Sequence, residues 1–364
     1  MDKDEIQKNK SDIYRLNEYK KKIEYKFQKE PQNLKFKLNI TKKNTNIWWN
    51  DIFEIFISIK DNKEYLVSPN NNNYNLDIFT LLDNKKILSF KGHNKYIRTI
   101  RYFLNKKNYF DEYLISGDDN HIVIIWEISN NKNIKYQIVT KYMDDIYSCL
   151  LIFPHNNDEN YIITSTYFDN KGFGSEERAT KVFSLSSGKF IKYIINSEDI
   201  PIYYLLLWYN KKNDKYYIIQ LSYEIVIINN LLEDDIYSEF KQEKEESYFS
   251  GFIYNKDDNE YLCFSSSKGF INVYDLYNKK ILKIIDIKKC KLAHIIQWNE
   301  KYIIVADFNN NSFKIIDFEQ DKIISDIGGQ HKGYVTSIKK INHPVYGESL
   351  LSAGCDKTIK LWSI

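Results

Sequence analysis

The sequence has little of what builds disulfide frameworks, metal sites and membrane spans. Its four cysteines lie far apart among 364 residues and form no CxxC pair, so neither a disulfide framework nor a zinc site is expected. The longest apolar stretch, residues 200–209, contains a proline and is about half the ~20 residues of a spanning helix. No apolar region follows the charged start of the chain, so no signal peptide is expected. We therefore expect a non-secreted, cytoplasmic protein, with cytoskeletal or nuclear association left open.

Charge of one sign is not in excess either. The chain has 52 basic and 49 acidic residues, a net charge of only +3. Such a balance creates no global field that would attract nucleic acid or an acidic membrane, so we expect neither as a partner. A phosphate-binding glycine loop is also missing, and the histidines outside the repeat motifs stand singly. We therefore expect no cofactor and no metal ion.

What the sequence does have is a repeat. A short β-prone run ends in a hydrophobic residue about every 46 residues, at Phe79, Trp126, Phe183, Ile228, Tyr274, Ile316 and Trp362. Repeats of this length, made of short strands and polar turns, are typical of β-propellers with four-stranded blades. Residues 33–364 are therefore predicted to form an all-β, seven-bladed propeller with four-stranded antiparallel blades. Six or eight blades remain open as alternatives.

The last blade has no room for its fourth strand. Its strands are expected at residues 334–341, 349–352 and 358–362, and the sequence stops at residue 364. An unpaired edge would expose backbone donors and acceptors to aggregation. The isolated alternating segment at residues 34–40 can supply the missing strand. This predicts that an N-terminal strand closes the last blade.

Residues 1–32 differ from the rest of the chain. They are rich in lysine and glutamate, their apolar residues recur at three- or four-residue steps, and Pro31 would end such a stripe. This pattern predicts a short, charged N-terminal helix. Two interpretations stay open: a frayed tail or a helix lying on the propeller, and a coiled-coil or partner-docking helix. The stripe is too short for sustained heptads.

Two segments carry a more detailed motif. One begins at Gly92-His93 and continues through residues 114–127, and the other begins at His331 and continues through residues 350–362. Both segments resemble WD repeats. The detailed resemblance covers about a quarter of the chain, because the other blades keep only the hydrophobic skeleton. The resemblance implies a WD-repeat propeller.

The resemblance also implies a hydrogen-bond relay inside these two blades. WD repeats link a loop histidine, a second-strand serine or threonine, a turn aspartate and a third-strand tryptophan. In the last blade these are His331, Ser352, Asp356 and Trp362; in the second they are His93, Ser116, Asn120 and Trp126. Because a buried imidazole is costly without partners, the relay is expected to be structural. No nucleophile elbow or oxyanion motif accompanies it, so we expect no catalytic residue and no enzyme.

An insertion in the third blade is the candidate site for partner binding. About a dozen extra residues, 167–178, lie between its second and third strands. In WD propellers such loops open on the face that commonly receives partners. Tyr167, Phe168, Phe173 and Arg178 belong to the residue types enriched at interface hot spots, although a neutral insertion is the alternative.

Taken together, these observations and the resemblance imply a non-catalytic scaffold that binds other proteins. Residues 1–32 would offer a second, helix-mediated contact. One alternative is a phosphoinositide-binding propeller, but such proteins use paired arginines and this chain has no two adjacent arginines. The other is an enzyme using the central channel, which would need carboxylates or histidines at several inner strand starts. Those starts are mainly apolar.

Overall fold

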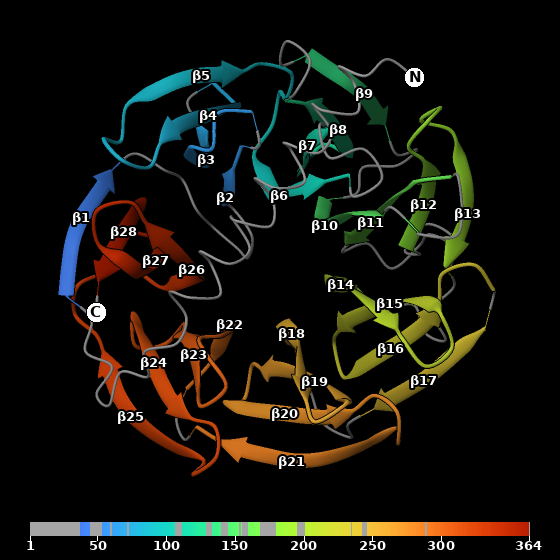
Figure 1. The fold of residues 1–364 in the computed structure, drawn as a ribbon, viewed down its shortest axis with the longest axis vertical. Coiled ribbons are helices and arrows are strands. Elements are labelled where there is room, and N and C mark those ends of the chain that lie inside the picture. The colour runs from blue at the N-terminus through green and yellow to red at the C-terminus, as the bar shows by residue number, and fades with distance from the viewer. Residues whose placement is uncertain are drawn as a thin grey trace, which may run out of the picture. The chain divides into compact units, whose positions relative to one another are not determined.

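The computed structural model of the chain shows a ring of antiparallel sheets (Figure 1). It describes residues 37–43, 53–58, 60–70, 73–105, 111–128, 133–139, 145–152, 154, 159–167, 180–194, 201–233, 235–241, 246–287 and 290–363. Within these residues the strands form seven four-stranded sheets, and each sheet is one blade. The prediction of seven four-stranded antiparallel blades is confirmed.

The blades follow one another along the sequence. Blade 1 contains β2 (Glu54–Ile57), β3 (Glu64–Asn70), β4 (Asn75–Thr80) and β5 (Lys86–Phe90); blade 2 contains β6 (Ile97–Leu104), β7 (Glu112–Asp118), β8 (Ile122–Glu127) and β9 (Asn133–Val139). Blade 3 contains β10 (Asp145–Ile152), β11 (Tyr161–Tyr167), β12 (Thr180–Ser184) and β13 (Phe190–Ile194); blade 4 contains β14 (Ile202–Asn210), β15 (Lys215–Ser222), β16 (Ile225–Asn230) and β17 (Ile236–Lys241). Blade 5 contains β18 (Tyr248–Lys256), β19 (Asn259–Ser266), β20 (Phe270–Asp275) and β21 (Lys280–Asp286); blade 6 contains β22 (Leu292–Gln297), β23 (Tyr302–Asp307), β24 (Ser312–Asp317) and β25 (Lys322–Ile327). Blade 7 contains β26 (Val335–His343), β27 (Gly347–Gly354), β28 (Thr358–Ser363) and β1 (Lys37–Lys43).

Blade 7 joins the two ends of the ring. β1 pairs antiparallel with β28, so that Leu38 lies opposite Trp362. The predicted closure of the last blade by an N-terminal strand is confirmed, and it removes the edge that β28 would otherwise expose. The helix predicted over residues 1–32 lies outside the described residues.

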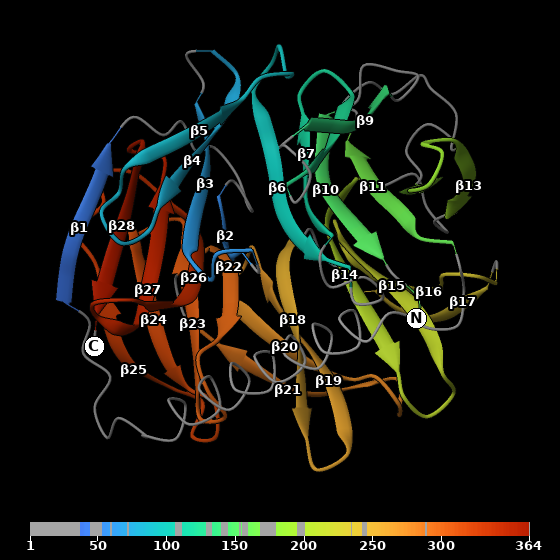
Figure 2. The ribbon, with the colours of Figure 1, turned by 45° about the horizontal axis from the view of Figure 1, so that its top comes forward.

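Burial follows the position of each strand within its blade. The first strands stand around the middle of the ring and the fourth strands lie on its outside (Figures 1 and 2). The second and third strands are buried almost throughout, as in β7 and β24, whereas fourth strands such as β21 and β25 are largely exposed. Hydrophobic clusters join neighbouring blades: one contains Leu76 of blade 1 and Trp126 of blade 2, and another contains Phe53 of blade 1 and Leu351 of blade 7. The core therefore lies between the blades.

A one-residue bulge interrupts the pairing of the first and second strands in blades 2 to 7. The residues left out of the ladder are Arg98, Tyr147, Tyr203, Phe249, Ala293 and Thr336. A bulge turns a side chain out of the regular alternation of a strand. All six residues therefore take equivalent places near the start of an innermost strand.

The register of blade 4 corrects one equivalence drawn from the sequence. In blade 2, Trp126 lies opposite Leu114, and two residues later the backbone of Ile128 bonds to Glu112. The same pattern in blade 4 is made by Asn229, opposite Ile218, because the backbone of Leu231 bonds to Tyr216. Asn229, rather than Ile228, therefore occupies the recurring position. Four apolar residues in a row precede Asn229 in β16, so hydrophobicity alone could not fix the register.

No helix among the described residues combines the length and the apolarity of a membrane span.

Candidate functional site

The last blade holds a connected row of polar side chains. Ser352 Oγ lies 2.8 Å from His331 Nε2 and accepts a 2.8 Å hydrogen bond from Trp362 Nε1. His331 Nδ1 lies 3.1 Å from both carboxylate oxygens of Asp356, and the Thr358 hydroxyl donates to the same carboxylate at 2.7 Å. The structure thus brings His331, Ser352, Asp356 and Trp362 together.

Electrostatics fix the protonation of this relay. Burial lowers the pKa of His331 despite the nearby Asp356 charge, so the imidazole is neutral. The protonated Nδ1 donates a hydrogen bond to the carboxylate. The unprotonated Nε2 therefore accepts a hydrogen bond from the Ser352 hydroxyl. Burial raises the pKa of Asp356, but the hydrogen bonds from Thr358 and Lys332 outweigh it and leave the pKa low. Every donor in the relay has an acceptor.

Serine, imidazole and carboxylate follow one another here as in a hydrolase triad, but their surroundings differ from those of a triad. Ser352 is completely buried, and its oxygen already accepts the Trp362 N–H. A substrate carbonyl therefore has no approach to that oxygen, which a nucleophile requires. The row stabilises the blade by satisfying its own buried polar groups.

Blade 2 has a second relay that differs in one member. His93 Nε2 lies 2.6 Å from Ser116 Oγ, which also accepts a 2.9 Å hydrogen bond from Trp126 Nε1. The carboxylate beside His93 Nδ1, at 2.8 Å, belongs to Asp118. The assignment of Asn120 to this role is wrong. Its side-chain nitrogen instead lies 3.5 Å from Asn94.

The difference arises from one position at the end of the second strand. Asp118 in β7 and Gly354 in β27 have equivalent places, because Asp118 lies opposite Ile97 and Gly354 lies opposite Val335, just before the bulge of each first strand. A Cβ at Gly354 would lie 2.9 Å from His331 Nδ1, so the missing side chain makes room for Asp356 to reach the ring. In blade 2 the side chain of Asp118 fills that space itself. Its second oxygen accepts the backbone N–H groups of Asn120 and Ile122, as an aspartate does in a tight turn.

The same position is polar in other blades without a complete relay. Asp307 in blade 6 is fully buried and lies 3.3 Å from Lys314 Nζ. Burial raises its pKa, but hydrogen bonds from Asn310 and Cys290 and the Lys314 charge outweigh burial and leave the pKa low. In blade 5 the equivalent Ser266 accepts the Lys268 backbone N–H at 3.1 Å. A polar residue therefore ends the second strand in blades 2, 5 and 6, which the sequence itself shows, whereas blade 7 has Gly354 there.

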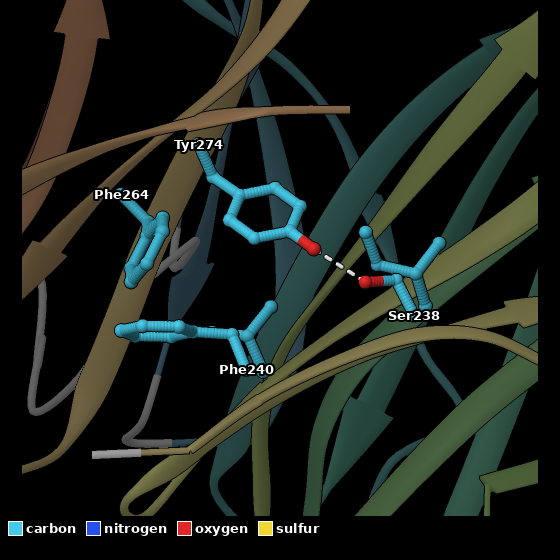
Figure 3. Close-up of a pocket in the computed structure, with 6 residues that line it drawn as sticks. Ser238, Phe240, Phe264 and Tyr274 are labelled. Atoms are coloured by element: carbon cyan, nitrogen blue, oxygen red, sulfur yellow. Dashed lines mark hydrogen bonds between the residues drawn. The ribbon is translucent and has the colours of Figure 1, made fainter. Parts of the chain in front are cut away.

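Blades 4 and 5 replace the relay with other groups. In blade 4, Gln220 Nε2 donates at 2.7 Å to Asn229 Oδ1, and the Thr180 hydroxyl of blade 3 donates to Gln220 Oε1. In blade 5, Phe264 and Tyr274 take the serine and tryptophan places, and the Tyr274 hydroxyl points at Ser238 of β17 and bonds to it (Figure 3).

The space around Tyr274 is not a ligand pocket. Phe240 and Phe264 lie with their ring centroids 6.1 Å apart beside the Tyr274 ring (Figure 3). The gap between these side chains and β16 leaves no room for a water molecule. Apolar packing thus replaces the polar relay between blades 4 and 5.

Side chains from blades that are not neighbours meet in the middle of the ring. The Arg101 guanidinium of blade 2 lies 4.6 Å above the Tyr204 ring of blade 4 and donates at 2.9 Å to the Leu205 carbonyl. His294 of blade 6 lies edge-on to Tyr204, with 6.3 Å between ring centroids. These contacts link blade 2 to blade 4 and blade 4 to blade 6. No group of three or more His, Cys, Asp or Glu residues suited to a metal ion occurs in the part of the chain that the structure describes.

The predicted partner-binding loop is not part of this description. Phe168, Phe173 and Arg178 lie outside the described residues, and Tyr167 is placed only by its backbone at the end of β11. Their role stays a prediction.

Comparison with known families agrees with the geometry. The family described as WD domain, G-beta repeat matches residues 84–127 and 324–363. These segments contain the two relays around His93 and His331. No curated protein matches the chain. Two matched repeats inside a closed ring of seven four-stranded blades support a WD-repeat propeller family for this chain.

Proposed function

We propose that this protein is a non-catalytic scaffold that binds other proteins within a larger assembly. WD-repeat propellers are generally interaction modules, and a rigid ring that presents many loops suits that role. The observation that carries the proposal is that the best candidate for chemistry, the serine–histidine–aspartate row of blade 7, is buried and internally satisfied. Accessible aromatic side chains such as Tyr96 and Tyr334 lie in loops.

Two attachment regions follow from this proposal. The propeller presents one, through its loops, and residues 1–32 provide a second, helix-mediated contact. Two weak contacts on one chain give useful avidity when the partner engages both. We further propose that the protein acts in the cytoplasm, as expected for a chain whose four cysteines form no disulfide.

An affinity capture from the native organism tests the scaffold. Three forms are compared: the full chain, a form without residues 1–32, and a form in which a short Gly-Ser turn replaces residues 168–178. Stoichiometric partners captured by the full chain and lost with either deletion support the proposal and locate the contact. The absence of partners with all three forms, under conditions where each gives the circular dichroism of a folded propeller, contradicts it.

A further inference from the structure

We propose that the ring has a pH-sensitive latch where blade 7 meets blade 1, and that protonation of the buried His343 releases it. We call this contact the closing seam. On the blade 7 side it comprises β26, β27 and the turn at residues 343–347, and on the blade 1 side it comprises β2, β3 and the turn at residues 80–86. The latch concerns the closure of the ring and is independent of the proposed function.

The two ends of the chain meet through non-covalent contacts. Strands β26 to β28 follow blade 6 in the sequence, whereas β1 leads into blade 1, so no peptide bond joins the C-terminal strands to blade 1 (Figure 1). One contact is the pairing of β1 with β28. The other is the closing seam, where Leu81 of blade 1 packs in one cluster with Ile341 of blade 7, and where Lys339 forms a 2.6 Å ion pair with Glu54. Loosening this seam therefore weakens the closure of the whole ring.

Three backbone groups hold the His343 ring in the closing seam. His343 is the last residue of β26 and is only 1% exposed. Its Nδ1 accepts the backbone N–H groups of Val345 at 3.2 Å and Tyr346 at 3.4 Å. Because a backbone N–H can only donate, Nδ1 is unprotonated, and Nε2 therefore carries the proton and donates at 3.2 Å to the Leu81 carbonyl. One neutral tautomer thus joins the turn of blade 7 to blade 1.

A protonated imidazole does not fit these partners. It donates from both nitrogens, so its Nδ1 would face two N–H donors and lose both hydrogen bonds. The Tyr346 ring lies 4.8 Å from the imidazole between centroids, so the new charge would also be buried. Burial accordingly lowers the pKa of His343, against the opposite effect of its hydrogen bond to Leu81. The charged ring therefore leaves its site, and the turn of blade 7 separates from Leu81.

Other charged and titratable side chains of the closing seam bond elsewhere or stand at its rim. Among the described residues, those that share the side of His343 or lie across the seam from it are Lys339, Tyr346, Glu54, Glu64, Asp83 and Lys85. Lys339 pairs with Glu54, and Asp83 accepts the Thr80 hydroxyl proton in a hydrogen bond. The hydrogen bonds of the His343 ring go to backbone groups instead. His343 is therefore the group whose protonation places donors against donors.

Blade 4 makes the same turn contact without a titratable group. Asn210 stands seven residues after the bulge at Tyr203, as His343 stands seven residues after the bulge at Thr336. Asn210 Oδ1 accepts the backbone N–H of Lys212, two residues further along, at 2.9 Å. An amide oxygen accepts this hydrogen bond at any pH, whereas an imidazole accepts it only while Nδ1 is unprotonated. The turn of blade 7 therefore depends on pH, and the equivalent turn of blade 4 does not.

Proton linkage gives the sign and the size of the effect. The pKa of His343 is lower in the closed seam than in solvent, so the latch is closed above about pH 6.5 and opens as the pH falls below that value. An imidazole released into solvent titrates near its ordinary pKa of 6.5, so at pH 5.5 about ten copies are charged for each neutral one. Since the closed seam excludes the proton, the open population should rise about tenfold between pH 7.5 and 5.5.

Hydrogen–deuterium exchange of the full chain at pH 7.5 and 5.5, read by mass spectrometry and corrected for the intrinsic rate at each pH, tests the latch. We expect residues 80–86 and 343–349 to open about tenfold more often at pH 5.5. The turn at residues 210–215 is the internal control and should not change. His343→Asn supplies an acceptor that does not titrate, so its turn should exchange alike at both pH values. The increase should persist in His331→Gln, which removes the other buried imidazole of blade 7.

Equal protection of residues 343–349 at both pH values, or an increase that His343→Asn retains, would overturn the inference. An equal increase in all blades would overturn it as well, because it would indicate unfolding of the whole ring and not the opening of one seam. The comparison of the two turns within the wild-type protein decides the question even where His343→Asn does not fold.

Discussion

Replacing Trp362 by alanine tests the ring closure and the relay together. Trp362 is 2% exposed, and its ring meets Phe313 of blade 6 at 5.1 Å between centroids. Its N–H donates to Ser352, and its strand pairs with both β27 and β1. Removing a buried tryptophan costs about 3–5 kcal/mol through lost packing and the cavity left behind. We expect Trp362→Ala to lower the free energy of unfolding by that amount.

A conservative variant separates the two contributions. Trp362→Phe keeps most of the contact with Phe313 but removes the donor to Ser352, so about 0.5–1.5 kcal/mol should be lost. Trp126→Phe is the matched variant in blade 2, where the donor bonds to Ser116 at 2.9 Å, and it should lose a similar amount.

Urea denaturation followed by far-UV circular dichroism measures both effects, because that signal does not depend on the tryptophan itself. An unchanged midpoint for Trp362→Ala would refute the placement of this residue in the closing blade. Equal losses for the alanine and phenylalanine variants would show that the hydrogen bond, and not packing, dominates.

Three further outcomes follow from buried groups. Burial holds the pKa of His331 below its usual 6.5, so the unfolded chain takes up a proton at a higher pH than the folded protein does. The free energy of unfolding should therefore fall as the pH drops below about 6.5, and it should fall less in His331→Gln. Urea midpoints measured between pH 7.5 and 5 test this. Gly117→Val should lower the free energy of unfolding by about 1–3 kcal/mol or more, because a Cβ at this position would lie 2.7 Å from the Cβ of Ile146. In the control variant Gly328→Ala the new Cβ meets no atom closer than 3.4 Å, so this variant should have the melting temperature of the wild type. A thiol reagent at pH 8 should label Cys355 first, although slowly, because burial raises the pKa of this thiol. The reagent should reach the buried thiols only after unfolding. Burial raises the pKa of each of them, to about 12 for Cys290; the other two are Cys149 and Cys263.

The sequence by itself determined the architecture. A period of about 46 residues depends only on strand and turn lengths, and the alternating pattern of residues 34–40 predicted the strand that pairs with β28. The relay of blade 7 was also readable, because its four members stand at the spacing that the WD repeat requires. Such features are local, so they can be predicted from the sequence without knowing which residues contact one another across the ring.

Only the tertiary structure decided which residues share a site. Asp118 rather than Asn120 meets His93, and Asn229 rather than Ile228 takes the recurring position, because register and turn geometry set which side chain reaches inward. Bulges in three blades likewise bring the rings of Tyr147, Tyr203 and Phe249 together, although neighbouring members of this row stand more than forty residues apart in the sequence.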